Sequence, residues 1–135
     1  MGGENQEMTV VAELKNVTKT YGDKTVLDKI NLQIHAGETL ALLGPNGSGK
    51  TTLLKILAFI ENPSNGEVKF QGETVHFKNI EQNRMQSTLV FQRTVLFNTS
   101  VYNNVAYGLR IRKIPEKTRH EEIRNALKLV RLEGF

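Results

Sequence analysis

The segment from Gly44 to Thr52 constrains the fold of this chain more than any other feature. Its Gly-Pro-Asn-Gly-Ser-Gly-Lys-Thr run fits the spacing of a phosphate-binding loop, or P-loop. An apolar run precedes the loop and a helix-like pattern follows it, which is the context that a P-loop requires. The sequence therefore predicts an α/β chain of the P-loop NTPase class.

The residue types of this loop suit a nucleoside triphosphate bound with Mg²⁺. Glycines allow a tight turn with inward-pointing N–H groups, and the following helix adds the positive end of its dipole. Lys50 is predicted to pair with the β and γ phosphates. Thr51 is expected to complete the coordination of Mg²⁺, and Thr52 to donate to an α-phosphate oxygen. The predicted binding residues are Gly44, Pro45, Asn46, Gly47, Ser48, Gly49, Lys50, Thr51 and Thr52.

The chain before and just after the loop shows strand patterns and one helix pattern. Thr9 to Lys15 and Val26 to Ile34 contain partly alternating apolar positions around a turn at Tyr21 to Asp23, which predicts antiparallel strands. Thr39 to Leu43 is apolar without alternation and predicts a central strand buried on both faces. Lys50 to Phe59 predicts a largely buried helix.

The remaining chain divides into short strands and then helices. Glu67 to Phe70 and Glu73 to Phe77 predict a hairpin around Gln71 and Gly72, and Ser87 to Phe91 predicts another short strand. From Val101 onward the pattern is helical. The last helix is predicted to start at Pro115 and Glu116 and to present one apolar face, made of Ile123, Ala126, Leu127 and Val130.

Two residues outside the loop narrow the class of nucleotide-binding protein. Tyr21 ends a predicted strand, where its ring can stack on an adenine base, and Gln92 follows Thr88 to Phe91, where its amide can reach the magnesium or the attacking water. Taken singly, each is equally well explained as a packed tyrosine or a polar loop residue. The ordered set of Tyr21, the P-loop and Gln92 favours the functional interpretation.

With these motifs the chain resembles the nucleotide-binding domain of ATP-binding cassette (ABC) transporters, from Leu14 to Phe135. The resemblance implies that Tyr21 stacks on adenine, that Gly44 to Thr52 is the Walker A motif, and that Gln92 is the Q-loop glutamine. It implies ATP and Mg²⁺ as cofactors, with Lys50 and Gln92 as catalytic residues and Thr51 and Gln92 as metal-contacting residues.

The resemblance also implies partners and a cellular location. The family pairs two ATP-binding subunits head to tail, on the cytoplasmic face of the membrane. The region from Gln92 to Leu109 looks like the part of importer ATPases that faces the transmembrane permease subunit. The likeness points to import of an oxyanion such as tungstate, molybdate or phosphate.

The expected organisation is a polar tail at residues 1–8 and a partial nucleotide-binding domain at 9–135. Its β subdomain and P-loop core extend to about residue 95, and a helical subdomain begins at about residue 96. The sequence contains no LSGGQ-type signature, Walker B carboxylates or switch histidine, and His35, His76 and His120 are expected at the surface. We therefore expect the first part of a longer transport ATPase that binds Mg-ATP, hydrolyses little by itself and is marginally stable.

Composition excludes several other classes. The net charge is only +4, without a basic stripe interleaved with aromatics, so nucleic-acid binding is not expected. No apolar run is long enough to cross a bilayer. The alternatives are a soluble ABC ATPase of translation or repair and a regulatory module that binds nucleotide without hydrolysis. A small-molecule P-loop kinase fits poorly, because a long β region precedes the loop.

Overall fold

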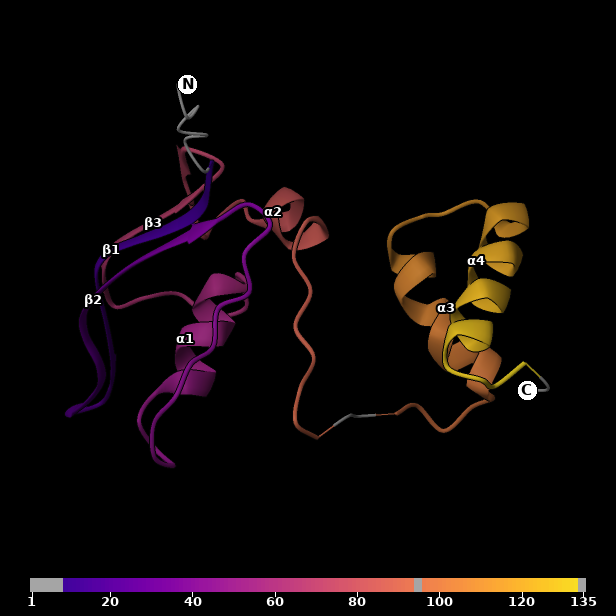
Figure 1. Cartoon of the computed structure of the whole chain (residues 1–135), viewed down its shortest axis with the longest axis horizontal. Helices are drawn as coiled ribbons and strands as arrows, with labels where there is room; N and C mark the ends of the chain where they lie inside the picture. Colours follow the sequence, from indigo (N-terminus) through magenta and orange to yellow (C-terminus); the bar gives the residue numbers. More distant parts are fainter. Residues whose placement is uncertain (1–8, 94–95, 134–135) are drawn as a thin grey trace, which may run out of the picture. The chain divides into compact units, whose positions relative to one another are not determined.

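The computed structural model describes residues 9–93 and 96–133. The chain divides into two compact units, with the boundary in the sequence between Leu89 and Val90, and each unit is described by itself. Strands dominate the first unit and helices the second (Figure 1). The tail expected at residues 1–8 lies outside the described residues.

The first unit is built on a four-stranded sheet in the order β2-β1-β3-β4. β1 (Val10–Tyr21) and β2 (Lys24–His35) are long antiparallel strands, and β1 also pairs antiparallel with β3 (Asn65–Phe70). The first hairpin closes with Tyr21 opposite Lys24. The predicted antiparallel pair and its turn are confirmed, with both strands longer than expected.

A register shift interrupts β1 between Leu14 and Val17, and side chains compensate for the broken ladder. Asn16 has a left-handed backbone, and its N–H donates to Asn31 Oδ1 at 2.9 Å. The same interruption brings the backbone of β3 very close, since a Cβ atom on Gly66 would lie 2.4 Å from the Asn16 carbonyl oxygen. Glycine is therefore required at this crossing.

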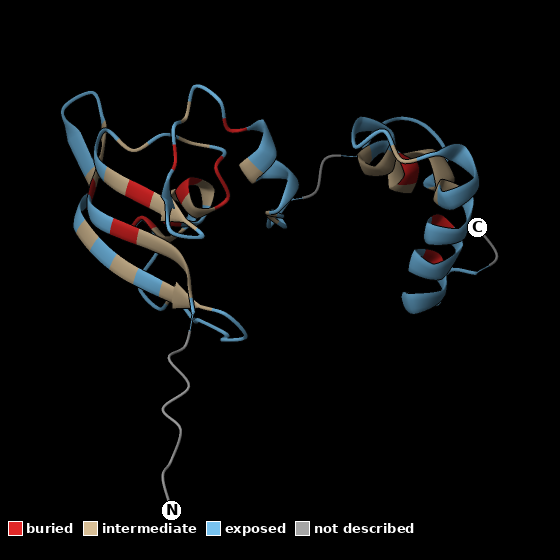
Figure 2. Cartoon of the chain, turned by 90° about the horizontal axis from the view of Figure 1, so that it is seen from above, coloured by how far each residue is buried: buried red, intermediate tan, exposed pale blue. Residues whose placement is uncertain are grey.

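Helix α1 (Lys50–Leu57) covers the sheet and closes the core of the first unit. Its Leu53 and Ile56 are buried, while Leu54 is exposed, so one face of the helix carries the packing. Figure 2 shows buried positions in red on the strands and on α1. The predicted helix is confirmed, two residues shorter. The core cluster consists of Leu14, Val17, Leu27, Leu53, Ile56, Phe59, Val68, Val75 and Ile80.

After β3 the chain forms the predicted hairpin and then a short helix that the sequence did not predict. β4 is only Glu73–Thr74, shorter than expected. The unpredicted helix is α2 (Glu81–Met85). Its Arg84 Nε donates to the Phe59 carbonyl oxygen at 2.9 Å, which ties α2 to the end of α1.

Two predicted strands are absent from the described part of the chain. Neither Thr39–Leu43 nor Ser87–Phe91 is assigned as a strand. Leu43 is 93% exposed while Leu42 packs against the core, so the burial on both faces expected for Thr39–Leu43 is also wrong. The physical reason is that a strand is stabilised by backbone hydrogen bonds to an adjacent strand. No described segment pairs with either run. An apolar run without alternation indicates that its side chains can be buried. It does not indicate that another strand is available to pair with it.

The second unit is a pair of helices, α3 (Val101–Ile111) and α4 (Glu116–Leu129). The Ser100 side chain caps α3 by accepting from the Asn103 N–H, and Pro115 precedes α4 as predicted. The small core between the helices consists of Ala106, Ile123 and Leu127, with Tyr102, Val105 and Leu109 packed against it.

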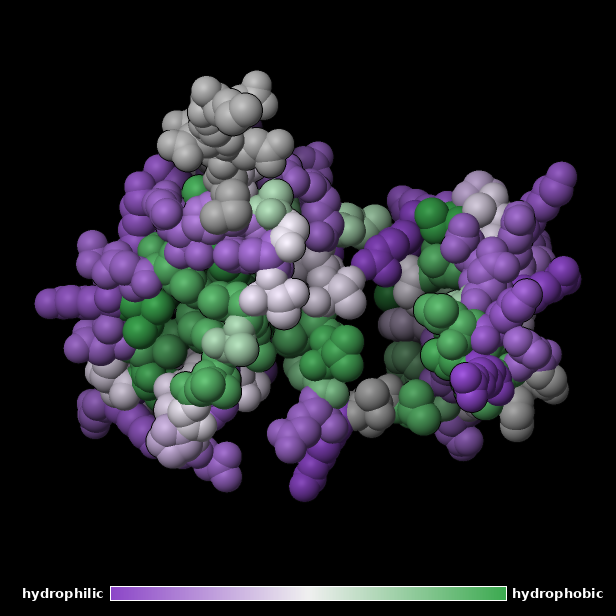
Figure 3. All heavy atoms as spheres, in the orientation of Figure 1, coloured by the Kyte–Doolittle hydropathy of each residue, from purple (hydrophilic) through white to green (hydrophobic). Residues whose placement is uncertain are grey.

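Two of the four positions predicted for the apolar face of α4 are buried. Ile123 and Leu127 are buried, but Ala126 and Val130 are exposed, because one neighbouring helix covers a narrower stripe than four positions require. Apolar side chains, green in Figure 3, are visible at the surface of both units. Within the described residues no helix combines the length and the apolar character needed to cross a bilayer.

Candidate functional site

The loop between Gly44 and Lys50 turns through three glycines with positive φ. These are Gly44 at 156°, Gly47 at 83° and Gly49 at 89°. At Gly49 a Cβ atom would lie 2.8 Å from both the Val26 carbonyl oxygen and Leu27 Cδ2, so the loop backbone packs directly on β2. Any side chain at position 49 would push the loop away from the sheet, so this glycine sets the position of the whole turn.

Gly49 is also the N-cap of α1, and no side chain caps this helix end. The first bond of the helix runs from the Leu53 N–H to the Gly49 carbonyl at 2.9 Å. The N–H groups of Lys50, Thr51 and Thr52 therefore have no acceptor inside the helix and face its N-terminal side. Together with the helix dipole, they make this end attractive to an anion.

Lys50 folds back over the loop in this structure. Its Nζ donates to the carbonyl oxygens of Gly44 and Pro45, both at 2.8 Å, and lies 3.4 Å from Ser48 Oγ. The ammonium group thus lies beside the turn that leads into the uncapped N-terminus of α1. Phosphate oxygens placed there would be stronger acceptors than the carbonyls, because a hydrogen bond between charged partners is roughly twice as strong as a neutral one.

Tyr21 lies at the end of β1 and is 46% exposed. Its hydroxyl donates to Glu61 Oε1, and Lys19 Nζ lies over the ring, 5.1 Å from its centroid. Acceptance by Glu61 and partial burial raise the pKa of the Tyr21 phenol, while the side chain of Thr52 lowers it. The structure therefore brings the predicted stacking residue beside the first turn of α1.

The same contact acts on the carboxyl of Glu61. The Tyr21 hydroxyl, followed by Lys19, lowers the pKa of Glu61 below its usual range. Lys19 Nζ lies 3.2 Å from Glu61 Oε1 and donates to the Asn62 carbonyl at 2.7 Å. Sequence reasoning missed Glu61 and Lys19, since no local pattern shows that the turn after α1 reaches the end of β1.

Gln92 belongs to the second unit, where it is exposed in an irregular segment. Its role toward the magnesium or the attacking water stays a prediction. Within residues 9–93 and 96–133 no three His, Cys, Asp or Glu side chains are grouped as metal ligands. Mg²⁺ held through phosphate oxygens needs few protein ligands, and the Thr51 hydroxyl on the exposed first turn of α1 fits that role.

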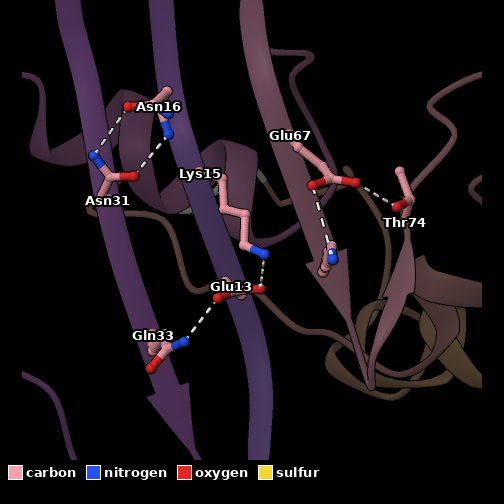
Figure 4. A network of polar contacts seen from close by, with 8 residues as sticks. Glu13, Lys15, Asn16, Asn31, Gln33, Glu67 and Thr74 are labelled. Atoms are coloured by element: carbon pink, nitrogen blue, oxygen red, sulfur yellow. Dashed lines mark hydrogen bonds and ion pairs between the residues drawn. The ribbon is translucent and has the colours of Figure 1, made fainter.

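Two hollows of the first unit lie on the sheet. One hollow of about 170 Å³ lies between Val10, Glu13 and Lys69. Glu13 also belongs to a polar network on the strands. In this network Gln33 Nε2 and Lys15 bind Glu13, and Thr74 Oγ1 donates to Glu67 at 2.6 Å (Figure 4). The loop from Gly44 to Lys50 is an open turn, which suits a ligand gripped by backbone N–H groups.

Residues 27–135 match the family model described as ABC transporter. The chain belongs to the ABC transporter family. The match begins in β2 and includes the glycine turn, α1 and the whole second unit. Membership of this family implies a nucleotide-binding domain, and the predicted fold class is confirmed.

Two curated relatives of this ABC family chain are import ATPases. It is 42% identical over 130 residues to the spermidine/putrescine import ATP-binding protein PotA of Clostridium acetobutylicum, covering 96% of this chain and 36% of that protein. It is 44% identical over 124 residues to the Fe(3+) ions import ATP-binding protein FbpC of Escherichia coli K12, covering 91% and 35%. The chain thus spans about a third of the length of these relatives.

A solved structure supports the fold independently. The cbiO1 protein of Clostridium perfringens, described as part of the ABC transporter complex cbiONQ, superposes with a TM-score of 0.75 at 34% identity. The match covers 89% of this chain and 50% of that one. The α/β fold with its antiparallel sheet is therefore that of an ABC nucleotide-binding domain.

Proposed function

We propose that this chain binds Mg-ATP at Gly44 to Thr52 as part of the ATP-binding subunit of an ABC importer. The observation that carries the proposal is the glycine turn leading into the uncapped N-terminus of α1, with Lys50 Nζ beside it. Free N–H groups, a helix dipole and a lysine at one point are what a triphosphate requires. Family membership and import ATPases as relatives support the assignment.

Within this site each residue has a proposed role. Lys50 pairs with the β and γ phosphates, and Thr52 donates to an α-phosphate oxygen. The ring of Tyr21, beside Thr52, stacks on adenine, because the ribose that carries the base also carries the α-phosphate. Thr51 contacts Mg²⁺, and a contact of Gln92 with the same ion stays a prediction from the sequence. The ion supplies charge neutralisation at the β and γ phosphates when it is bound.

The organisation proposed for the chain follows its two kinds of structure. Residues 9 to about 95 form the β subdomain and P-loop core, and residues from about 96 begin a helical subdomain. Gln92 to Leu109 is proposed as the contact with a transmembrane permease subunit at the cytoplasmic face of the membrane. A second ATP-binding subunit, paired head to tail, completes the site. Exposed apolar side chains in this region, such as Leu96, Phe97 and Tyr107, support a protein contact there.

The transported solute is not assigned. The relatives named above import polyamines or Fe(3+), and neither is described as an oxyanion importer. The predicted specificity for tungstate, molybdate or phosphate has no support from them. Import relatives also give the proposed transport role more support than a soluble ABC ATPase of translation or repair, or a regulatory module.

The test is calorimetric titration of Mg-ATP into the chain and into Lys50→Ala. Removing the ammonium group is expected to abolish measurable binding. Lys69→Ala is the matched control, because it removes the same charge from β3 on the sheet, where Lys69 pairs with Glu67. Equal Mg-ATP affinity in the wild-type chain and in Lys50→Ala would refute the site.

A further inference from the structure

Glu61 lies where the turn after α1 meets the end of β1, and it binds two side chains of β1 at once. Its carboxylate accepts from the Tyr21 hydroxyl and lies 3.2 Å from Lys19 Nζ. The side chains of Lys19 and Glu61 are only 15% and 19% exposed. A shielded carboxylate with two donors is held in one position, because breaking either contact would leave a desolvated charge with fewer hydrogen-bond partners.

The position of Glu61 is set by the end of α1. The N–H groups of Ile60 and Glu61 both donate to the Lys55 carbonyl, at 2.8 and 3.3 Å, and Phe59 takes a left-handed backbone between them and the helix. The following loop is held to β1 as well, since the Ser64 N–H donates to the Thr18 carbonyl at 2.8 Å. The helix that begins at the glycine turn therefore also carries the anchor of Tyr21.

Lys19 completes the arrangement by covering one side of the ring. Its Nζ lies over the Tyr21 ring, and it is held there by Glu61 and by the Asn62 carbonyl. A cation over one aromatic face leaves the opposite face as the surface for stacking, and Tyr21 is exposed. The tyrosine is thus held by its hydroxyl and covered on one face.

We propose that Glu61, together with Lys19, is a positioning residue for the nucleotide base: it anchors the Tyr21 hydroxyl so that one defined face of the ring receives adenine. This inference rests on the proposed Mg-ATP site. A ring fixed before binding loses less rotational freedom when the base arrives. Glu61 thereby contributes to the preference of the site for a nucleotide over a bare triphosphate without touching the ligand.

Affinities for Mg-ATP and for magnesium tripolyphosphate are measured by calorimetry in the wild-type chain and in Tyr21→Ala, which removes the ring. The same measurements are made in Glu61→Gln and Tyr21→Phe, which weaken or remove its anchor. Both variants keep the size of the side chain, and Tyr21→Phe keeps the ring. We expect the affinity for Mg-ATP to fall about three- to tenfold in each variant, because an unanchored ring must be ordered when the base binds, with tripolyphosphate affinity unchanged. The double variant should lose little more than Tyr21→Phe alone, because both changes break one contact.

Glu67→Gln is the matched control. Glu67 also accepts from a hydroxyl, that of Thr74, and lies 3.9 Å from Lys69 Nζ, but these partners are on the β3–β4 hairpin (Figure 4). Its substitution should leave both affinities unchanged. A spectroscopic readout follows the phenol directly by ultraviolet absorbance. The titration that disappears in Tyr21→Phe should occur at lower pH in Glu61→Gln, because the acceptor that raises the pKa of Tyr21 is weakened.

Three outcomes separate this proposal from the one on which it rests. Wild-type Mg-ATP affinity in Glu61→Gln and Tyr21→Phe, with a selective loss in Tyr21→Ala, overturns the anchoring role and leaves adenine stacking intact. No selective loss in Tyr21→Ala overturns both adenine stacking and its anchor. Equal losses for ATP and tripolyphosphate in Glu61→Gln show a general disturbance of the site and also overturn the anchoring role.

Discussion

The two apolar runs on either side of the glycine turn differ in how far their side chains are buried. Thr39–Leu43 precedes the turn and α1 follows it, and each contains several large apolar side chains. Ile56 of α1 is fully buried at 0% exposure, whereas Leu43 is 93% exposed. The difference cannot come from hydrophobicity, because both runs are rich in leucine or isoleucine.

The cause is the way each element satisfies its backbone. A helix makes its hydrogen bonds internally, so α1 needs only one face against the sheet to be stable. A strand needs a neighbour for every N–H and C=O group, and no described segment supplies one to Thr39–Leu43. Apolar composition therefore predicts burial only where the partner belongs to the same folded unit.

The contrast is tested most strongly by truncating one side chain on each side of the turn. Ile56→Ala should lower the free energy of unfolding by about 2–5 kcal/mol, since it empties part of a packed core. Leu43→Ala should change it by less than about 0.5 kcal/mol, because the side chain is exposed. Urea unfolding of the chain followed by circular dichroism measures both. Comparable losses in the two variants would show that Leu43 is packed in solution.

The next test concerns the residue that joins the turn to α1. Gly49→Ala should destabilise the chain by about 1–3 kcal/mol, because the added methyl group would overlap β2 in a left-handed backbone. Gly47→Ala is the matched control, with φ of 83° but no atom within 4 Å of the added carbon. It should lose only the backbone term of about 1 kcal/mol. Equal unfolding free energies for the two variants would show that the approach of Gly49 to β2 does not matter.

The same contrast explains how much could be predicted from the sequence. The hairpin of β1 and β2, helix α1 and the glycine turn were predicted, because turn residues, helical periodicity and glycine spacing are local signals. The strands at Thr39–Leu43 and Ser87–Phe91 were wrong, because pairing is not local. Glu61 was missed for the same reason, since only tertiary structure brings it to Tyr21.

The smallest expected effect is a pH dependence of the free energy of unfolding, which arises from Glu61 in the turn after α1. Because the pKa of Glu61 is lowered in the folded chain, its contribution is present above the ordinary carboxyl pKa and is lost as the pH falls through the lowered value. The groups facing it are the Tyr21 hydroxyl, Lys19 and, at longer range, Lys55. Since the shielded Glu61 side chain still keeps 19% of its surface in contact with water, the contribution should not exceed about 1 kcal/mol.

The alkaline side has the opposite sign. Because the pKa of Tyr21 is raised, the stabilisation from its neutral hydroxyl is present below the ordinary tyrosine pKa and is lost as the pH rises through the raised value. Unfolding free energies of the wild-type chain, Glu61→Gln and Leu43→Ala across this range measure both limbs. In Glu61→Gln the loss of unfolding free energy at acid pH should disappear and the loss at alkaline pH should be smaller. Leu43→Ala should show the same pH dependence as the wild-type chain. A wild-type pH profile in Glu61→Gln would mean that the contact between β1 and the turn after α1 contributes nothing to folding.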